Sequence, residues 1–272
     1  MKIQRSEYQE ELEIAVEAAE SSGDIMDNYR EEKISVKDTK SSEVDIITQA
    51  DHDCQEKIVE IIEEEFPEDG FIGEENLNSK SENSRNWVID PIDGTLNFKK
   101  GHKYFCTSIA LEVDGETKVG VVYSPESGLD QLFYSVEGEG AYIRRDEHHE
   151  ELRPSNHRGI EGGFFQLTFI KKHSDSRWKT HQKVLESFRA RDARYLKQGS
   201  LALSACKVAE GVFDGVIEYG WKWDFSAARL ILSEAGGSYR YRPEKSEGLD
   251  EFIGCNGRFQ EELNQLLDDS RP

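Results

Sequence analysis

The stretch WVIDPIDGTLNF, residues 87–98, places two aspartates three positions apart at the end of an apolar run. The proline between them restricts the turn, so that Asp90 and Asp93 can point to the same place. Gly94 allows close backbone approach, and its N–H group and that of Thr95 can then face an anion. This combination suits a divalent cation that carries a phosphate. The competing interpretation is an ordinary turn followed by a helix cap.

Two aspartates are too few ligands for a metal centre, so further acidic groups must come from elsewhere in the chain. Glu74 and Glu75 follow a short apolar segment, and Asp224 follows Trp223 at the start of a predicted helix. Four carboxylates brought together would repel one another unless cations lie between them, so we predict a two-metal cluster. Each group alone has a simpler interpretation, because acidic surfaces are rich in Glu-Glu pairs and aspartate often caps helices.

The composition limits the partners of such a site. The chain has 272 residues and a formal net charge of −21, from 34 Lys and Arg against 55 Asp and Glu. This charge argues against nucleic-acid binding by a basic surface, and it means that an anionic ligand needs a local cation. The four cysteines are widely spaced, and no apolar run is long enough for a signal peptide or a membrane span. We therefore expect a cytoplasmic protein without a membrane partner.

Hydrophobic periodicity indicates the elements that position the acidic groups. Helical spacing predicts helices over residues 6–30 and 48–66, with a short strand at 33–37 between them. Apolar segments at 71–73 and 87–89 are predicted strands. Both groups of carboxylates therefore lie at strand ends.

The rest of the chain divides into two parts. Strands at 107–113, 117–123 and 131–135 form a predicted meander, with a hairpin turn at Asp114. The polar segment 144–156 is interpreted as a connection, with a boundary near residue 150. Beyond it we predict a strand at 164–170, helices at 178–188 and 200–209, a strand at 212–218, a helix at 225–235, strands at 238–241 and 251–255, and a helix at 259–267.

Taken together, these motifs resemble the inositol monophosphatase family of the lithium-sensitive, magnesium-dependent phosphatases. The matching segments are VDIITQAD (44–51), GFIGEE (70–75), WVIDPIDGTLNF (87–98), GVVYSP (120–125), GEGAY (138–142) and WDFSAARLILSEAGG (223–237). The resemblance implies a layered α+β/α/β sugar-phosphatase fold, in the order α-β-α-β-α. Residues 1–150 would form an N-terminal α+β subdomain and residues 151–272 a C-terminal α/β subdomain, with the active site between them.

The resemblance also implies a set of metal ligands. Glu74, Asp90 and the carbonyl group of Ile92 would bind one ion. Asp90, Asp93 and Asp224 would bind a second ion, so that Asp90 bridges the two. The expected cofactor is Mg²⁺, with two or three ions per subunit.

Further roles follow from the same resemblance. Thr95, paired with Asp51, would position and deprotonate the attacking water, and Glu74 completes the catalytic set. Lys40 would lie near the third, more weakly held metal ion. The residues that would contact the substrate are Ile92, Asp93, Gly94, Thr95, Gly199, Ser200, Leu201 and Glu218.

Three features depart from the family pattern. Leu201 stands where the family commonly has a small residue, and Glu218 precedes Asp224 by six positions instead of seven. Residues 152–198 lack the expected motifs, in a region that helps shape the family's substrate pocket. The substrate is therefore the least determined part of the prediction.

We expect a phosphoric monoester hydrolase that uses in-line attack of a metal-activated water on inositol 1-phosphate or a similar sugar or polyol phosphate. Fructose 1,6-bisphosphate is the first alternative substrate, followed by histidinol phosphate and 3′-phosphoadenosine 5′-phosphate. The resemblance implies a homodimer. The non-enzymatic alternative is a partner of the transcription machinery, a role that some bacterial relatives have. No direct nucleic-acid partner is expected.

Overall fold

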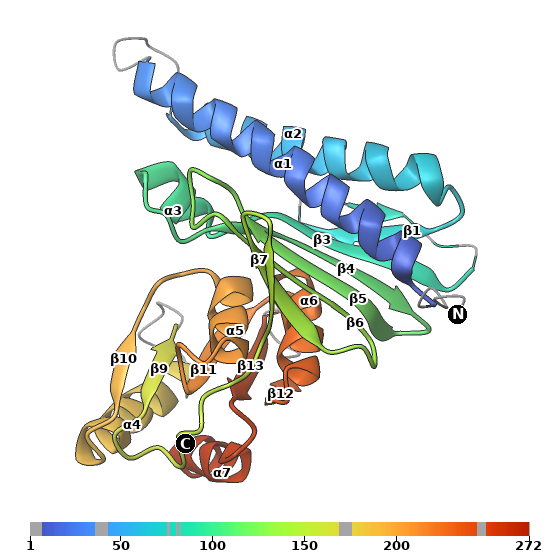
Figure 1. The fold of residues 1–272 in the computed structure, drawn as a ribbon. Coiled ribbons are helices and arrows are strands. Elements are labelled where there is room, and N and C mark those ends of the chain that lie inside the picture. The colour runs from blue at the N-terminus through green and yellow to red at the C-terminus, as the bar shows by residue number, and fades with distance from the viewer. Residues whose placement is uncertain are drawn as a thin grey trace.

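The computed structural model describes residues 7–35, 43–74, 77–79, 81, 83–168, 176–243 and 249–271. Two long helices, α1 (Gln9–Ser35) and α2 (Glu43–Glu65), lie side by side over a large sheet (Figure 1). On α1, Ala15, Ala18 and Ala19 recur at helical spacing and are fully buried. Their small size lets the helix approach its neighbours closely, because little side chain separates the backbones.

The large sheet has eight strands among the described residues, in the order β2-β1-β3-β4-β5-β6-β7-β8. They are β1 (Gly70–Gly73), β2 (Asn78–Ser79), β3 (Arg85–Asp93), β4 (Cys106–Val113), β5 (Glu116–Ser124), β6 (Gln131–Val136), β7 (Ala141–Arg145) and β8 (His148–Glu151). Among the described strands of this sheet, only β1 and β3 pair in parallel. The β4–β5 hairpin turns at Asp114 and Gly115, which both have positive φ, as a tight two-residue turn requires.

The second sheet has five described strands, in the order β10-β9-β11-β13-β12. They are β9 (Phe164–Leu167), β10 (Arg194–Leu196), β11 (Gly215–Gly220), β12 (Ser238–Arg242) and β13 (Asp250–Cys255). The other described helices are α3 (Thr95–Lys100), α4 (Ser176–Ala190), α5 (Leu201–Ala209), α6 (Lys222–Glu234) and α7 (Gln260–Ser270). β9 pairs in parallel with both β10 and β11, whereas β13 runs antiparallel to its neighbours.

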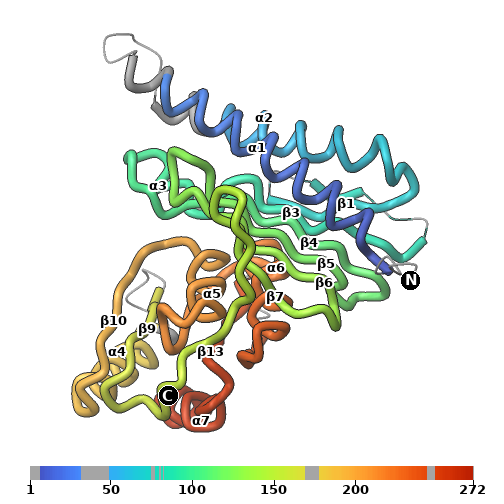
Figure 2. The backbone as a smooth tube through the Cα atoms, in the orientation of Figure 1, coloured from blue at the N-terminus to red at the C-terminus, as the bar shows by residue number. Residues whose placement is uncertain are grey.

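The elements stack in five layers (Figures 1 and 2). Helices α1 and α2 cover the outer face of the first sheet, α5 and α6 lie between the sheets, and α4 and α7 cover the far face of the second sheet. This order confirms the predicted α-β-α-β-α fold class. Residue 150 lies in the last strand of the first sheet, and the division into two subdomains stays a prediction.

Alternation along β3 decides which side chains face the middle layer. Trp87 and Ile89 pack into the core beneath α1 and α2, whereas Val88 packs into the core around α5 and α6. Because successive side chains of a strand point to opposite faces, Asp90 points to the same inner face as Val88. The strand therefore delivers its first aspartate to the space between the sheets.

A buried ion pair attaches α6 to this inner face. Glu112 on β4 accepts a hydrogen bond of 3.0 Å from Nη2 of Arg229 and also pairs with Lys222. Arg229 donates further hydrogen bonds to Thr117 on β5. All the groups of a buried pair must be satisfied for it to be tolerated, and this network meets that condition. It fixes α6 across β4 and β5.

Two local predictions were wrong. Residues 33–35 belong to helix α1 instead of a strand, and residues 36 and 37 lie outside the described chain. The polar segment 144–156 is not only a connection, because Arg145 pairs with His148 and Tyr142 with Glu151 in the β7–β8 hairpin. Strand β8 lies at the sheet edge and is fully exposed, so its charged composition is that of a protected edge strand.

Candidate active site

The motif at the end of β3 forms an irregular strand end. Asp90 pairs with Ser108 of β4, and Asp93 pairs with Cys106, with a shift of register between the two pairs. Within this bulge the N–H of Ile92 donates to Oδ1 of Asp90 over 3.0 Å. A bulge redirects side chains, and here it holds Asp90 and Asp93 at the inner edge of the sheet.

Asp224 reaches the same edge from the other half of the chain. The hydroxyl of Ser108, the strand partner of Asp90, donates to the carbonyl oxygen of Trp223 over 3.3 Å. Asp224 comes next, and its Oδ2 accepts a hydrogen bond of 2.8 Å from the N–H of Trp221. The start of α6 is therefore fixed beside the end of β3. Asp90, Asp93, Asp224 and Glu74, which follows β1, are called the carboxylate cluster below.

The members of the carboxylate cluster influence one another strongly. Burial raises the pKa of Asp90 well above its usual value, and the charges of Asp224, Asp93 and Glu74 raise it further. Burial and the charge of Asp93 likewise raise the pKa of Asp224. Like charges at close range disfavour ionisation, so this cluster is costly unless positive charge is added.

A divalent cation fits this donor set. Asp90 is only 2% exposed, and the charges acting on it most strongly among the described residues are all carboxylates. Hard cations such as Mg²⁺ prefer carboxylate and carbonyl oxygens, and they would supply the missing positive charge. The carbonyl oxygen of Ile92, a further predicted ligand, accepts a hydrogen bond of 3.1 Å from the hydroxyl of Thr95. Its second lone pair remains suited to a cation.

The N-terminus of α5 holds Asp93. Oδ2 of Asp93 accepts hydrogen bonds of 2.6 Å from the hydroxyl of Ser200 and 2.7 Å from the N–H of Ala202. These bonds offset part of the effect of burial, so that the pKa of Asp93 is raised to about 6. Sequence reasoning assigned Ser200 to the substrate and missed this contact. Its signal was the serine directly before an apolar helix, which is a typical N-cap position, and Ser200 does accept from Leu203.

The remaining residues of the turn lie around the start of α3. Gly94 has a φ of 93°, and a Cβ there would lie 2.9 Å from the carbonyl oxygen of Tyr104, so only glycine fits. Thr95 is the first residue of α3 and is partly exposed. Asp51 is buried on α2, where the neighbouring Ala50 packs in one cluster with Ile92. The pairing of Asp51 with Thr95 stays a prediction.

The predicted substrate contacts lie at different depths. Gly199 is exposed with a φ of 81°, while Leu201 is buried against Gly220. Glu218 is buried on β11, and burial raises its pKa to about 8. Glu75 and Lys40 lie outside the described residues. The structure thus brings Asp90, Asp93, Asp224 and Glu74 together, and their roles as ligands stay predictions.

A tighter group of possible metal ligands lies elsewhere among the described residues. His52, Asp53 and Glu56 on α2 offer ligand atoms within 4.8 Å of one another. The oxygens of Asp53 already accept hydrogen bonds from Tyr29 and Gln49. Such exposed acidic groups are common on helix surfaces. In the carboxylate cluster, by contrast, Asp90 and Asp224 are buried and lie close enough for a side-chain hydrogen bond between them.

The chain matches the model of the inositol monophosphatase family over residues 7–270. It belongs to the inositol monophosphatase family. Inositol monophosphatase 2 of Saccharomyces cerevisiae is 35% identical over 208 residues, which cover 74% of this chain and 70% of that protein. A Nus factor SuhB of Pasteurella multocida is 38% identical over 230 residues, with 83% of both proteins covered.

Solved structures of the family have the same fold. The structure of inositol monophosphatase from Anabaena (Nostoc) sp. PCC 7120 has a TM-score of 0.79 and 27% sequence identity, and it covers 98% of each chain. The Mycobacterium tuberculosis SuhB structure also has a TM-score of 0.79, at 25% identity, covering 95% of this chain and 96% of that one. The family is generally metal-dependent, and membership in it supports a phosphatase.

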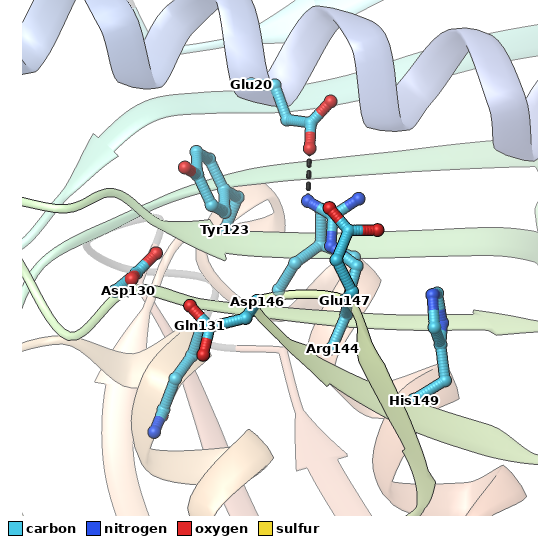
Figure 3. Close-up of a pocket in the computed structure, with 9 residues that line it drawn as sticks. Glu20, Tyr123, Asp130, Gln131, Arg144, Asp146, Glu147 and His149 are labelled. Atoms are coloured by element: carbon cyan, nitrogen blue, oxygen red, sulfur yellow. Dashed lines mark hydrogen bonds and ion pairs between the residues drawn. The ribbon is translucent and has the colours of Figure 1, made fainter.

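A second pocket, of about 260 Å³, lies away from the carboxylate cluster. It is bounded by α1 and by the ends of β5, β6 and β7 (Figure 3). Arg144 crosses it to pair with Glu20, and the other lining residues are mostly polar. Of its nine described lining residues, Tyr123 lies in the matching segment GVVYSP, but none is a predicted metal, catalytic or substrate residue, so the pocket has no part in the site proposed here.

The sequence also led to two expectations: cysteines outside any disulfide framework, and no membrane-spanning segment. All four cysteines are buried and unpaired in disulfides. In the part of the chain that the structure describes, every helix is too short or too polar to cross a lipid bilayer.

Proposed function

We propose that the chain is a Mg²⁺-dependent phosphatase that hydrolyses a small sugar or polyol phosphate, with inositol 1-phosphate as the first substrate to test. One observation carries this proposal: Asp90, Asp93 and Asp224, from two distant stretches of the chain, converge at one edge of the first sheet. Membership in the inositol monophosphatase family supports it.

Two Mg²⁺ ions would be held by Asp90, Asp93, Asp224, Glu74 and the Ile92 carbonyl. The ions would supply Lewis-acid activation of the attacking water and would neutralise charge on the leaving oxygen. Asp90 would be shared between them. Ser200 and Ala202 would keep the carboxylate of Asp93 in position, because they bond to its Oδ2.

Residues at the end of β3, the start of α3 and on α2 would accept the proton of the attacking water and bind the phosphate. Thr95 and Asp51 would position the attacking water and accept its proton. The first N–H groups of a helix lack intrahelical partners, so those of Gly94 and Thr95 would bind phosphate oxygens. Glu218 would orient the alcohol that leaves. These interactions strengthen as charge develops on the phosphoryl group, which is the requirement for faster reaction.

The proposal is tested by phosphate release from four esters: inositol 1-phosphate, fructose 1,6-bisphosphate, histidinol phosphate and 3′-phosphoadenosine 5′-phosphate. Each is assayed with Mg²⁺ and again with EDTA. We expect release in Mg²⁺ and its loss in EDTA, with the highest kcat/KM for inositol 1-phosphate. Equal phosphate release in EDTA would contradict the metal dependence. A higher kcat/KM for another ester would identify that ester as the better substrate.

A second function is favoured by the relatives named Nus factor SuhB. We propose as the alternative that the chain binds a protein of the transcription machinery, since the net charge of −21 disfavours direct contact with nucleic acid. A pull-down with wild-type protein and with Asp93→Asn separates the two functions. Recovery of RNA polymerase or an elongation factor in stoichiometric amount by both would support it. Recovery of neither would exclude it.

We also propose a cytoplasmic homodimer, by likeness to the family. The unpaired, buried cysteines are compatible with a reducing compartment. Light scattering of the purified protein should give twice the mass of one chain, and the mass of a single chain would contradict the dimer. Fractionation of cells should recover the protein with cytoplasmic markers.

A further inference from the structure

A pair of stacked tryptophans lies at the start of α6, one exposed and one partly buried. Trp221 comes directly before the helix and is 40% exposed. Its indole stacks on that of Trp223, with ring centroids 5.5 Å apart and an angle of 16° between the ring planes. Trp223 packs in turn against the core around α5 and α6. A large aromatic ring that is supported from below and open to water offers a surface for a ligand.

Trp221 is attached to the carboxylate cluster through its backbone. Its N–H donates to Oδ2 of Asp224 over 2.8 Å. The preceding residue, Gly220, is packed so closely that a Cβ there would overlap the carboxylate of Asp224 and lie 2.8 Å from Cδ1 of Leu201. The indole of Trp221 therefore begins beside a predicted metal ligand and near a predicted substrate contact. Its exposure leaves it accessible to a molecule bound at the cluster.

Two of the departures from the family pattern meet at this place. Leu201 stands where the family commonly has a small residue, and Glu218 precedes Asp224 by six positions instead of seven. The structure brings the two departures into contact, because Leu201 packs on Gly220 within the shortened segment. Together with Trp221 they make this side of the site apolar and aromatic.

The chemistry of this side of the site favours one kind of ligand. Lys222 is paired with Glu112 on β4, so within residues 219–223, all of which the structure describes, no cation is left for a second phosphate. An indole face binds flat or apolar ring faces by stacking, as aromatic side chains do with nucleobases. The C–H face of a sugar or cyclitol ring offers an apolar surface of the same kind. The shared feature is a ring carried by the alcohol of the ester.

We propose that Trp221 is a specificity-determining residue that stacks on a ring of the leaving alcohol while the phosphate is held at the carboxylate cluster. This inference rests on the proposed function and adds a requirement for the substrate: its alcohol carries a ring with an apolar face, which is either a nucleobase or a sugar or cyclitol ring. Esters of small open-chain alcohols would gain nothing from Trp221.

The test compares three esters in Trp221→Ala, which removes the indole and keeps the N–H that holds Asp224. Adenosine 2′-phosphate carries a nucleobase, inositol 1-phosphate a cyclitol ring, and glycerol 2-phosphate no ring. We expect kcat/KM to fall about tenfold for a ring-bearing ester, as for loss of a stacking contact, and to stay within about twofold for glycerol 2-phosphate. The ester with the larger fall identifies the ring. Trp221→Phe keeps an aromatic face and should recover most of the loss.

Tyr195→Ala is the matched control, because Tyr195 is an aromatic residue of similar exposure on the edge strand β10. It should change kcat/KM for none of the three esters, and thermal unfolding checks that each variant is folded. A fall that is equal for all three esters in Trp221→Ala, or no fall for any, would overturn the role of Trp221.

Failure of the proposed function gives a different result. If the wild-type protein releases phosphate from none of the three esters, the proposed function fails, and tryptophan fluorescence then decides the ring contact. Adenosine 2′-phosphate should quench the emission of the wild type more than that of Trp221→Ala, because the exposed indole is the one that stacks. Equal quenching, or none, would contradict the contact.

Discussion

The carboxylate cluster and a second buried group, made by Gln166, Ser204 and Glu218 and called the Glu218 group below, are both polar, yet their side chains interact differently. The cluster gathers side chains that repel one another, as the raised pKa values of Asp90 and Asp224 indicate. In the Glu218 group, burial raises the pKa of Glu218 to about 8, and hydrogen bonds from Ser204, Thr168 and Gln166 offset part of this effect. The first region therefore calls for cations, whereas the second is satisfied by its own hydrogen bonds and by a proton on Glu218.

The largest expected effect is on the cluster. Asp93→Asn should lower kcat by about 10³-fold or more at excess Mg²⁺, because loss of one electrostatic partner of the transition state already costs about 10²–10³. Phosphate release from inositol 1-phosphate measures it. Asp130→Asn, in an exposed turn with a positive φ that asparagine tolerates, is the control. Near-wild-type turnover of Asp93→Asn would show that Asp93 is not part of the active site.

Mg²⁺ should stabilise the fold through the carboxylate cluster and not through the Glu218 group. At about 100 times the dissociation constant, a ligand adds about 2.7 kcal/mol to the free energy of unfolding, which raises Tm by roughly 5 °C in a chain of this size. We expect this rise in the wild type and in Gln166→Met, and little rise in Asp224→Asn. Differential scanning calorimetry with Mg²⁺ or EDTA measures it. If Mg²⁺ raised the Tm of Asp224→Asn as much as that of the wild type, Asp224 would not be a metal ligand.

The pH dependence of stability tests whether the Glu218 group holds a proton where the carboxylate cluster would hold cations. The pKa of Glu218 is raised to about 8 in the folded chain, from 4.5 as its usual value. Between these values the folded state binds a proton that the unfolded state has lost, so the free energy of unfolding falls as pH rises. Glu218→Gln should abolish this part of the fall.

Urea unfolding in EDTA at pH 5 and pH 7.5 measures the difference between wild type and Glu218→Gln. The gain in stability of the variant should be small at pH 5 and on the order of 2 kcal/mol at pH 7.5. Glu137→Gln, at an exposed residue paired with Lys118, is the control and should show no such growth with pH. A gain that is equal at both pH values would show that Glu218 is not held neutral.

The smallest expected effect lies at the residue that links both regions. Ser200 donates to Asp93 and caps the helix that carries Ser204. Ser200→Ala should lower the free energy of unfolding by about 1 kcal/mol and kcat by about tenfold. Urea unfolding and phosphate release measure these changes. Ser200→Thr keeps a hydroxyl group and should recover most of kcat, and failure to do so would make the effect one of packing.

The two regions also differ in how far the sequence predicted them. Asp90, Asp93 and Asp224 stand in long motifs at strand and helix ends, so their local structure indicated their convergence. Gln166 stands in a stretch without a motif, and its orientation depends on parallel pairing with β11, some 50 residues away in the chain. Pairings over such a separation leave no local pattern in the sequence.

The fold shows the same division. The five-layer order was predicted from the family resemblance. Local polarity gave wrong predictions in two segments whose structure depends on tertiary contacts. Residues 33–35 alternate like a strand but extend α1, and the charged residues 148–151 form an edge strand. Edge strands need no apolar face, so composition alone does not distinguish them from a connection.

The central claim, that distant carboxylates hold divalent cations for phosphate transfer, is tested most directly by anomalous diffraction from crystals grown with Mn²⁺ and phosphate. We expect anomalous peaks of Mn²⁺ within coordination distance of oxygens of Asp90, Asp93 and Asp224, with phosphate beside Thr95. Anomalous peaks elsewhere, such as at His52 and Glu56, with none at these three aspartates would contradict it.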